Sequence, residues 1–180
     1  MLSEPAHLVG HSYGGLIALL AAAHRPDAVR SLTVVEPAVM SLMRGDPDIE
    51  RTIDAHYELL ASHGDNPRAF LEDFTANLGG DRTGVPNPLP PVLLQHVQLL
   101  MHERPPWEAE IPTEALSRAS FPKLVISGGH SQLQERMGDA LTEAIRPNAD
   151  RAVIEGAGHI VQRNAEAFNS RLEQFLSAAS

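Results

Sequence analysis

The sequence predicts an α/β fold in which parallel strands alternate with helices. Short runs rich in β-branched and apolar residues recur and end at glycine or proline, as in "SLTVVEP" and "KLVISGG". Such runs are typical of strands that are buried on both faces of a sheet. The segment between Met40 and Pro122 instead has helical periodicity broken by prolines. We therefore expect a helical insertion between two strands of one sheet.

The elements are predicted in order along the chain. The first strand covers Ala6 to Val9, and a helix follows from Gly14 to His24, because Pro26 disfavours helix in the residue before it. A second strand covers Val29 to Pro37. The later strands and helices are predicted at Lys123 to Gly129, Gln132 to Ile145, Arg151 to Gly158 and Ala165 to Leu176. We assign residues 1–39 and 116–180 to the core and 40–115 to a helical cap over the strand ends, where open α/β sheets bind ligands.

The composition excludes several classes of function. The 180 residues carry a formal net charge of -9 and contain no cluster of lysine and arginine, so we expect no nucleic-acid partner. The absence of cysteine excludes disulfides and thiolate chemistry. The longest apolar run, Leu16 to Ala23, is too short for a membrane span. We expect a cytoplasmic protein that acts on a small molecule, away from membranes, and that needs neither a metal nor a cofactor.

The stretch "LVGHSYGGLIALL" contains a G-x-S-x-G motif between the first strand and the first helix. This context predicts Ser12 as a nucleophile on a strained turn, with Gly10 and Gly14 required by crowding on either side. The helix start directs backbone N–H groups at developing negative charge, so the Tyr13 N–H is the candidate oxyanion donor. An inert serine in a glycine-rich turn is the alternative.

A serine nucleophile needs a base from another loop at the same edge of the sheet. His159 lies in "EGAGHIVQ", directly after the last predicted strand and before the last helix. We therefore predict His159 as the base. His11 and Trp107 are the further candidates for contact with substrate, Trp107 from the underside of the cap, although packing in the core accounts equally well for Trp107.

Together, "LVGHSYGGLIALLAAAHRPDAVRSLTVVEPA", "FPKLVISGGHS" and "GAGH" resemble the α/β-hydrolase superfamily. The resemblance implies a triad in the order Ser, acid, His, with Ser12 and His159 matching the nucleophile and the base. In most relatives the acid is an aspartate three residues past a glycine, but counting from Gly128 leads to Ser131, which carries no charge.

The superfamily has a second position for the acid, after the strand that follows the nucleophile helix, as in some haloalkane dehalogenases. Glu36, in "VVEPA", occupies that position here. A carboxylate at the end of a buried strand is costly unless something pairs with it, and a histidine N–H would do so. We predict Glu36 as the acid. A solvated Glu36 is the alternative, with Glu155 and Asp139 as further acid candidates.

The resemblance also implies several strands ahead of the turn, and we expect them to be absent here. The fold is then a partial α/β-hydrolase fold, mainly parallel, whose first strand is an exposed edge that a second copy of the chain can cover. Three explanations stay open: a fragment of a longer hydrolase, a short form that dimerises, and a catalytically inactive remnant.

These features predict a serine hydrolase that cleaves a small, mostly apolar carboxylic ester or lactone through an acyl-enzyme intermediate. Two alternatives use the same turn, namely hydrolysis of a carbon–carbon bond beside a carbonyl and formation of peracids. A third alternative is a noncatalytic binding domain.

Overall fold

The computed structural model describes residues 4–179, which form two compact units. The sheet unit comprises the chain up to Arg44 and again from Pro106 onward, and the helical unit comprises Gly45–Pro105. The helical segment carries no strand among its described residues. Its function as a cap stays a prediction.

The sheet unit contains a four-stranded sheet that is fully parallel, where the sequence predicts a mainly parallel one. The strands lie in the order β1-β2-β3-β4. The register pairs Gly10 with Val34, Val35 with Ile126, and Gly128 with Ile154. The carboxyl ends of all four strands therefore lie at one edge of the sheet. The strands are β1 (Ala6–His11), β2 (Val29–Val35), β3 (Lys123–Gly128) and β4 (Ala149–Ile154).

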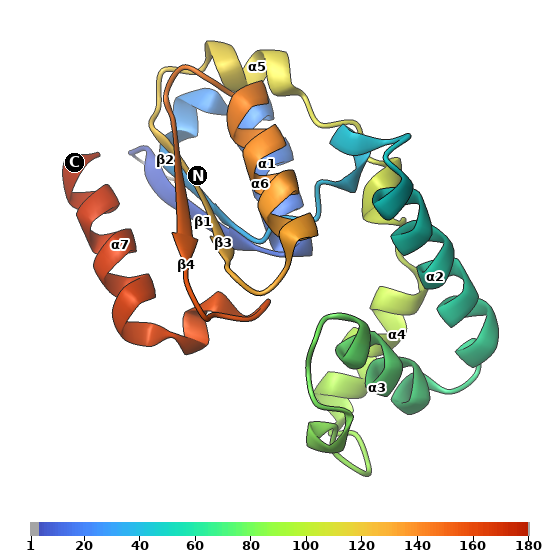
Figure 1. The fold of residues 1–180 in the computed structure, drawn as a ribbon. Coiled ribbons are helices and arrows are strands. Elements are labelled where there is room, and N and C mark those ends of the chain that lie inside the picture. Colours follow the sequence, from blue (N-terminus) through green and yellow to red (C-terminus); the bar gives the residue numbers. More distant parts are fainter. Residues whose placement is uncertain (1–3, 180) are drawn as a thin grey trace. The chain divides into compact units, whose positions relative to one another are not determined.

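Helices cover both faces of this sheet. Helices α1 (Tyr13–His24) and α6 (Gln132–Ala144) lie along one face, and α7 (Ala165–Ala178) lies along the other (Figure 1). Phe168 and Phe175 of α7 join a buried cluster that includes Val35 and Ile126 from the central strands. Burial of side chains of this size contributes roughly 1.5–3 kcal/mol each. Apolar residues on both faces of β2 and β3 are thus explained by contact with helices on both sides.

Short elements connect the sheet to the rest of the unit. Ser131 caps the amino end of α6, where its hydroxyl accepts a hydrogen bond from the Gln134 N–H at 3.4 Å. This cap satisfies one of the N–H groups in the first turn of α6 that have no partner within the helix. The other connections are the 3-10 helices Pro26–Ala28, Met40–Met43, Pro106–Glu108 and Val161–Arg163 and the short helix α5 (Thr113–Arg118).

The helical unit is built from three α-helices that pack on one another. Helices α2 and α3 each begin with a proline that follows an Asp46 or Asn66 cap, a combination that favours the first helical turn. Their core is a cluster of Leu59, Phe70, Val97 and Met101. The helices are α2 (Pro47–His63), α3 (Pro67–Asn77) and α4 (Pro91–His102), with a 3-10 turn at Arg82–Gly84.

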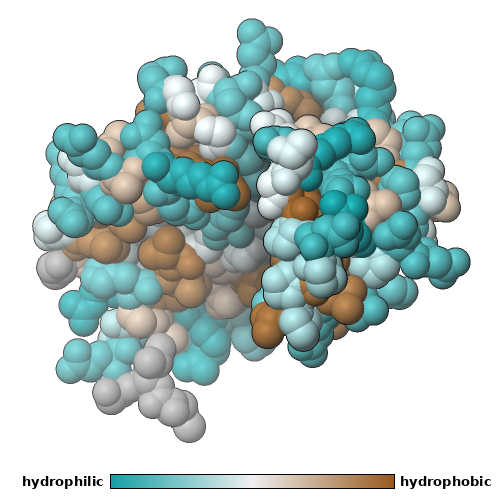
Figure 2. Space-filling model, turned by 90° about the horizontal axis from the view of Figure 1, so that it is seen from below, coloured by the Kyte–Doolittle hydropathy of each residue, from teal (hydrophilic) through white to brown (hydrophobic). Residues whose placement is uncertain are grey.

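Strand β1 forms one edge of the described sheet, since it pairs with β2 alone. Val9 on β1 and Ile17 on α1 are 47% and 54% exposed. Figure 2 shows the side toward which the strands point, where hydrophobic residues are scattered among hydrophilic ones. The covering of the β1 edge by a second copy stays a prediction. Among residues 4–179, no helix has the length and apolar character that a membrane crossing requires.

Candidate active site

Ser12 is the single residue between the end of β1 and the start of α1. Its φ of 55° and ψ of -123° lie in a region that L-residues rarely adopt, at a cost of roughly 1–3 kcal/mol. Backbone hydrogen bonds maintain this conformation. The Ser12 N–H donates to the Val35 carbonyl at 2.9 Å, and the Ser12 carbonyl accepts from the N–H groups of Gly15 and Ala38 at 2.9 and 3.1 Å. The turn is therefore held by β2 and by its own helix.

The glycines of this turn have different functions. A Cβ on Gly10 would lie 2.3 Å from the Gly14 carbonyl oxygen, so only glycine fits there. The prediction that Gly14 is required by the same crowding is wrong, because a Cβ at Gly14 would have no atom within 4 Å. Gly15 is the crowded position instead, where a Cβ would lie 2.9 Å from the Cβ of Pro37. The first turn of α1 thus directs Gly15 toward the end of β2.

His159 contacts both other predicted members of the triad. Its Nε2 lies 3.1 Å from the Ser12 Oγ, and its Nδ1 lies 3.1 Å from the Glu36 Oε2. The imidazole side chain is only 10% exposed. The residue lies in the loop after β4, at the carboxyl edge of the sheet. With the ring proton on Nδ1, the Nε2 lone pair is directed at the serine hydroxyl.

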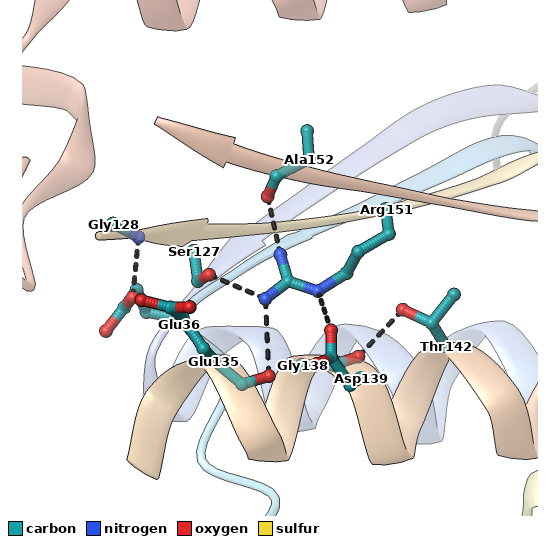
Figure 3. Close-up of polar contacts among 9 residues, drawn as sticks. All are labelled: Glu36, Ser127, Gly128, Glu135, Gly138, Asp139, Thr142, Arg151 and Ala152. Carbon is teal, nitrogen blue, oxygen red and sulfur yellow. Dashed lines mark hydrogen bonds and ion pairs between the residues drawn. The ribbon is translucent and has the colours of Figure 1, made fainter. Parts of the chain in front are cut away.

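Glu36 follows β2 directly and is buried, with its residue 1% exposed rather than solvated. Like Ser12, it has a positive φ, here 46°. Its Oε1 accepts a hydrogen bond from the Gly128 N–H at 2.7 Å (Figure 3). Its Oε2 lies 3.1 Å from the His159 Nδ1. Two donors thus compensate the cost of burying this carboxylate.

Gly128 is a site residue for which sequence reasoning found no function. Beyond donating its N–H to Glu36, it lies against the loop that carries His159. A Cβ on Gly128 would lie 2.4 Å from the Ala157 carbonyl oxygen and 2.8 Å from that of Gly158. A glycine at the end of a buried strand often marks a place where another backbone approaches closely, and this feature of the sequence could have indicated Gly128.

The other two acid candidates have different surroundings. Asp139 lies in α6 and pairs with the Nε of Arg151 at 3.0 Å (Figure 3). The same guanidinium donates to the Ser127 hydroxyl at 2.7 Å and to the Glu135 carbonyl at 3.3 Å, so it ties β3 and β4 to α6. Glu155 is exposed. The carboxylate that meets the Nδ1 of His159 is that of Glu36.

The other predicted site residues, His11, Tyr13 and Trp107, lie in three different surroundings. His11, the last residue of β1, contacts His159 through both its Nε2 and its ring. Burial lowers the pKa of His11 from its ordinary value of 6.5. Tyr13 opens α1, and its N–H as an oxyanion donor stays a prediction. Trp107 is 4% exposed within the sheet unit, and its contact with substrate also stays a prediction.

This arrangement provides a hydroxyl, an imidazole and a buried carboxylate joined in one line. Such a line can remove the serine proton as the hydroxyl attacks an electrophilic carbon, and it can stabilise the imidazolium that results. The helix start behind Ser12 adds backbone dipoles that favour negative charge beside the hydroxyl. Within residues 4–179, no group of three or more His, Asp or Glu side chains is arranged to hold a metal ion.

Comparison with known proteins shows which family this chain resembles. The sequence profile of the Alpha/beta hydrolase family matches residues 2–171. Two bacterial proteins named "Putative carbamate hydrolase RutD" are also similar. The one from Caulobacter segnis is 29% identical over 97% of this chain, and the one from another Caulobacter strain is 30% identical over 97%. This chain spans 66% of the length of each of these relatives.

Solved structures share the fold at lower identity. A carboxylesterase from the thaumarchaeon Nitrososphaera matches with a TM-score of 0.71 at 16% identity, over 98% of this chain and 66% of its own. The "Putative non-heme bromoperoxidase BpoC" of Mycobacterium tuberculosis matches with a TM-score of 0.64 at 20% identity, over 98% of this chain and 68% of its own. At these identities the likeness concerns the fold alone. Because the family profile covers nearly the whole sequence, the chain belongs to the alpha/beta hydrolase family.

Proposed function

We propose that this protein is a serine hydrolase that attacks the carbonyl carbon of its substrate with Ser12. The observation that carries the proposal is the continuous line of contacts from the Ser12 Oγ to the His159 Nε2 and from the His159 Nδ1 to the Glu36 Oε2, each 3.1 Å long. A hydroxyl has little nucleophilicity at its ordinary pKa, and an adjacent base supplies the missing activation.

The reaction proceeds in two halves. The Ser12 Oγ bonds to the carbonyl carbon while its proton passes to His159, and Glu36 stabilises the imidazolium that forms. His159 then gives this proton to the leaving oxygen, so that the alcohol departs and the acyl group stays on Ser12. Water then attacks the acyl carbon while its proton passes to His159. The bond from the acyl carbon to the Ser12 Oγ breaks, the imidazolium returns the proton to Oγ, and the carboxylic acid is released. The Tyr13 N–H is the proposed donor to the oxyanion in both halves.

The substrate we propose is a small, mostly apolar carboxylic ester or lactone. A carbamate is the second candidate, because the two similar Caulobacter proteins carry that activity in their name. Both classes present an acyl carbonyl bonded to a heteroatom leaving group, and the same triad serves both. A panel of p-nitrophenyl esters and p-nitrophenyl carbamates of increasing chain length distinguishes them by relative kcat/KM.

The decisive experiment is intact-mass analysis after exposure to a fluorophosphonate, with digestion to locate the adduct. We expect one adduct, on Ser12, in the wild-type chain. Ser12→Ala removes the nucleophile and serves as the control for labelling elsewhere, while His159→Ala retains Ser12 and should label far more slowly. A folded wild-type chain that forms no adduct would overturn the proposal and favour a noncatalytic binding domain.

A further inference from the structure

A second histidine contacts the proposed base from the strand that leads to the nucleophile. The Nε2 of His11 lies 2.9 Å from the backbone carbonyl oxygen of His159, which is 148 residues away in sequence. The two imidazole rings are tilted by 46°, with their centroids 4.8 Å apart. A carbonyl oxygen only accepts hydrogen bonds, so the Nε2 of His11 must carry a proton and donate it.

This contact falls on a segment with little regular structure of its own. His159 lies between the end of β4 at Ile154 and the 3-10 turn that starts at Val161. Its ring is fixed by Ser12 and Glu36, while its main chain is fixed by His11. Because His11 directly precedes Ser12, this bond ties the peptide of the base to the backbone of the nucleophile.

We propose that His11 is a positioning residue for His159: its Nε2–H holds the His159 carbonyl and thereby sets the distance between the base and the Ser12 hydroxyl. The proposal rests on the proposed function, since it concerns how the same triad reaches its working geometry. The Nε2 proton of a neutral His11 is committed to this bond, so the proposal assigns His11 to alignment rather than to substrate binding.

The charge state of His11 is consistent with this function. Burial lowers its pKa from 6.5, and the charge of a protonated His159 acts in the same direction, whereas the carboxylate of Glu36 and the bond to the carbonyl oppose the change. A neutral ring beside His159 can donate to the carbonyl without repelling the imidazolium that forms during the reaction.

Three substitutions at one position separate the donor from the ring. In His11→Gln the terminal amide nitrogen occupies about the place of Nε2 and can still donate to the carbonyl. In His11→Asn the amide is one methylene shorter and falls short of it. His11→Phe keeps a ring in place without any donor. His24→Phe, at the exposed end of α1, is the matched control for loss of a histidine.

The readout is the saturation kinetics of fluorophosphonate labelling at Ser12, which separates the binding constant from the maximal inactivation rate. We expect His11→Phe and His11→Asn to lower the maximal rate by between about tenfold and about 100-fold at an unchanged binding constant. His11→Gln should recover most of the lost maximal rate, and His24→Phe should have the maximal rate of the wild type. Wild-type rates in His11→Phe, or a His11→Gln as slow as His11→Phe, would overturn the proposal. A weaker binding constant at an unchanged maximal rate would instead assign His11 to ligand binding.

Hydrogen exchange tests the same bond without any reactive serine. Peptides covering residues 155–163 should exchange faster in His11→Phe than in the wild type or in His11→Gln, since the loop loses its tie to β1. Equal exchange in all three would refute the positioning function. A wild-type chain that is not labelled but shows this exchange pattern would refute the proposed function and leave the structural contact intact, so the two failures are distinguishable.

Discussion

Replacing Gly128 by alanine should displace His159, the proposed base, while leaving the side chains of Ser12, Glu36 and His159 chemically unchanged. The new Cβ would lie 2.4 Å from the Ala157 carbonyl oxygen, and ordinary contact begins at 3.4 Å, so the loop must retreat by about 1 Å (3.4 − 2.4). Ala157 and Gly158 immediately precede His159, so the imidazole moves with them. A displacement of about 1 Å costs about 100-fold in rate, and overpacking of this kind costs about 1–3 kcal/mol of stability.

The neighbouring glycine provides a matched control for this substitution. A Cβ on Gly129 would lie 2.7 Å from the Oε2 of Glu155, which is the mobile end of an exposed side chain rather than backbone. Gly129→Ala should therefore label with fluorophosphonate at nearly the wild-type rate and keep its stability within about 0.5 kcal/mol.

The assay compares the rate of Ser12 labelling and the urea midpoint for the wild type and the two alanine variants. Gly128→Ala should remain folded yet label about 100-fold more slowly. A folded Gly128→Ala that labels at the wild-type rate would show that the loop yields without moving His159, which would refute the steric argument. An equal loss of labelling rate in Gly128→Ala and Gly129→Ala would also refute the steric argument, because contact with the loop carbonyls is expected at Gly128 alone.

Three further predictions follow from the same contacts. Glu36→Gln leaves one oxygen for either the Gly128 N–H or His159, so labelling and turnover should fall by about 10⁴-fold, and near-normal rates would remove Glu36 from the triad. Arg151→Lys loses the planar set of donors to Asp139, Ser127 and Glu135 and should lower the free energy of unfolding by about 1–3 kcal/mol in urea titrations. Asp139→Asn should cost less than about 1 kcal/mol, because the Asp139 side chain is 71% exposed. A larger loss of stability in Asp139→Asn than in Arg151→Lys would contradict the view that the guanidinium ties β3 and β4 to α6. Burial lowers the pKa of His56 from 6.5, so the unfolded chain binds a proton at His56 more readily than the folded chain does. The stability that a neutral His56 permits above about pH 6.5 should therefore be lost as the pH falls below that value. The urea midpoint of His56→Phe should therefore fall less between about pH 7 and about pH 5 than that of the wild type, and parallel curves would exclude His56 as a cause.

Much of the fold could be predicted because its signals are local. The sequence predicts all four strands and the helices that follow β1, β3 and β4, since burial on two faces selects β-branched and apolar residues whatever their partners are. The boundaries shifted where backbone geometry intervened: β2 ends at Val35 because Glu36 has a positive φ, and β1 extends to His11 because its pairing with β2 continues to Val35.

Within the site, the sequence by itself determined which residue types stand at the carboxyl edge of the sheet. Ser12, Glu36 and His159 each follow a strand, and parallel strands bring their carboxyl ends together. Only the tertiary structure decided what those residues touch. The Gly128 N–H reaches Glu36 across 92 residues and His11 reaches the His159 carbonyl across 148, while Gly15 rather than Gly14 meets Pro37. Such contacts depend on the separation of backbones brought together by folding, and a run of residue types carries no measure of that separation.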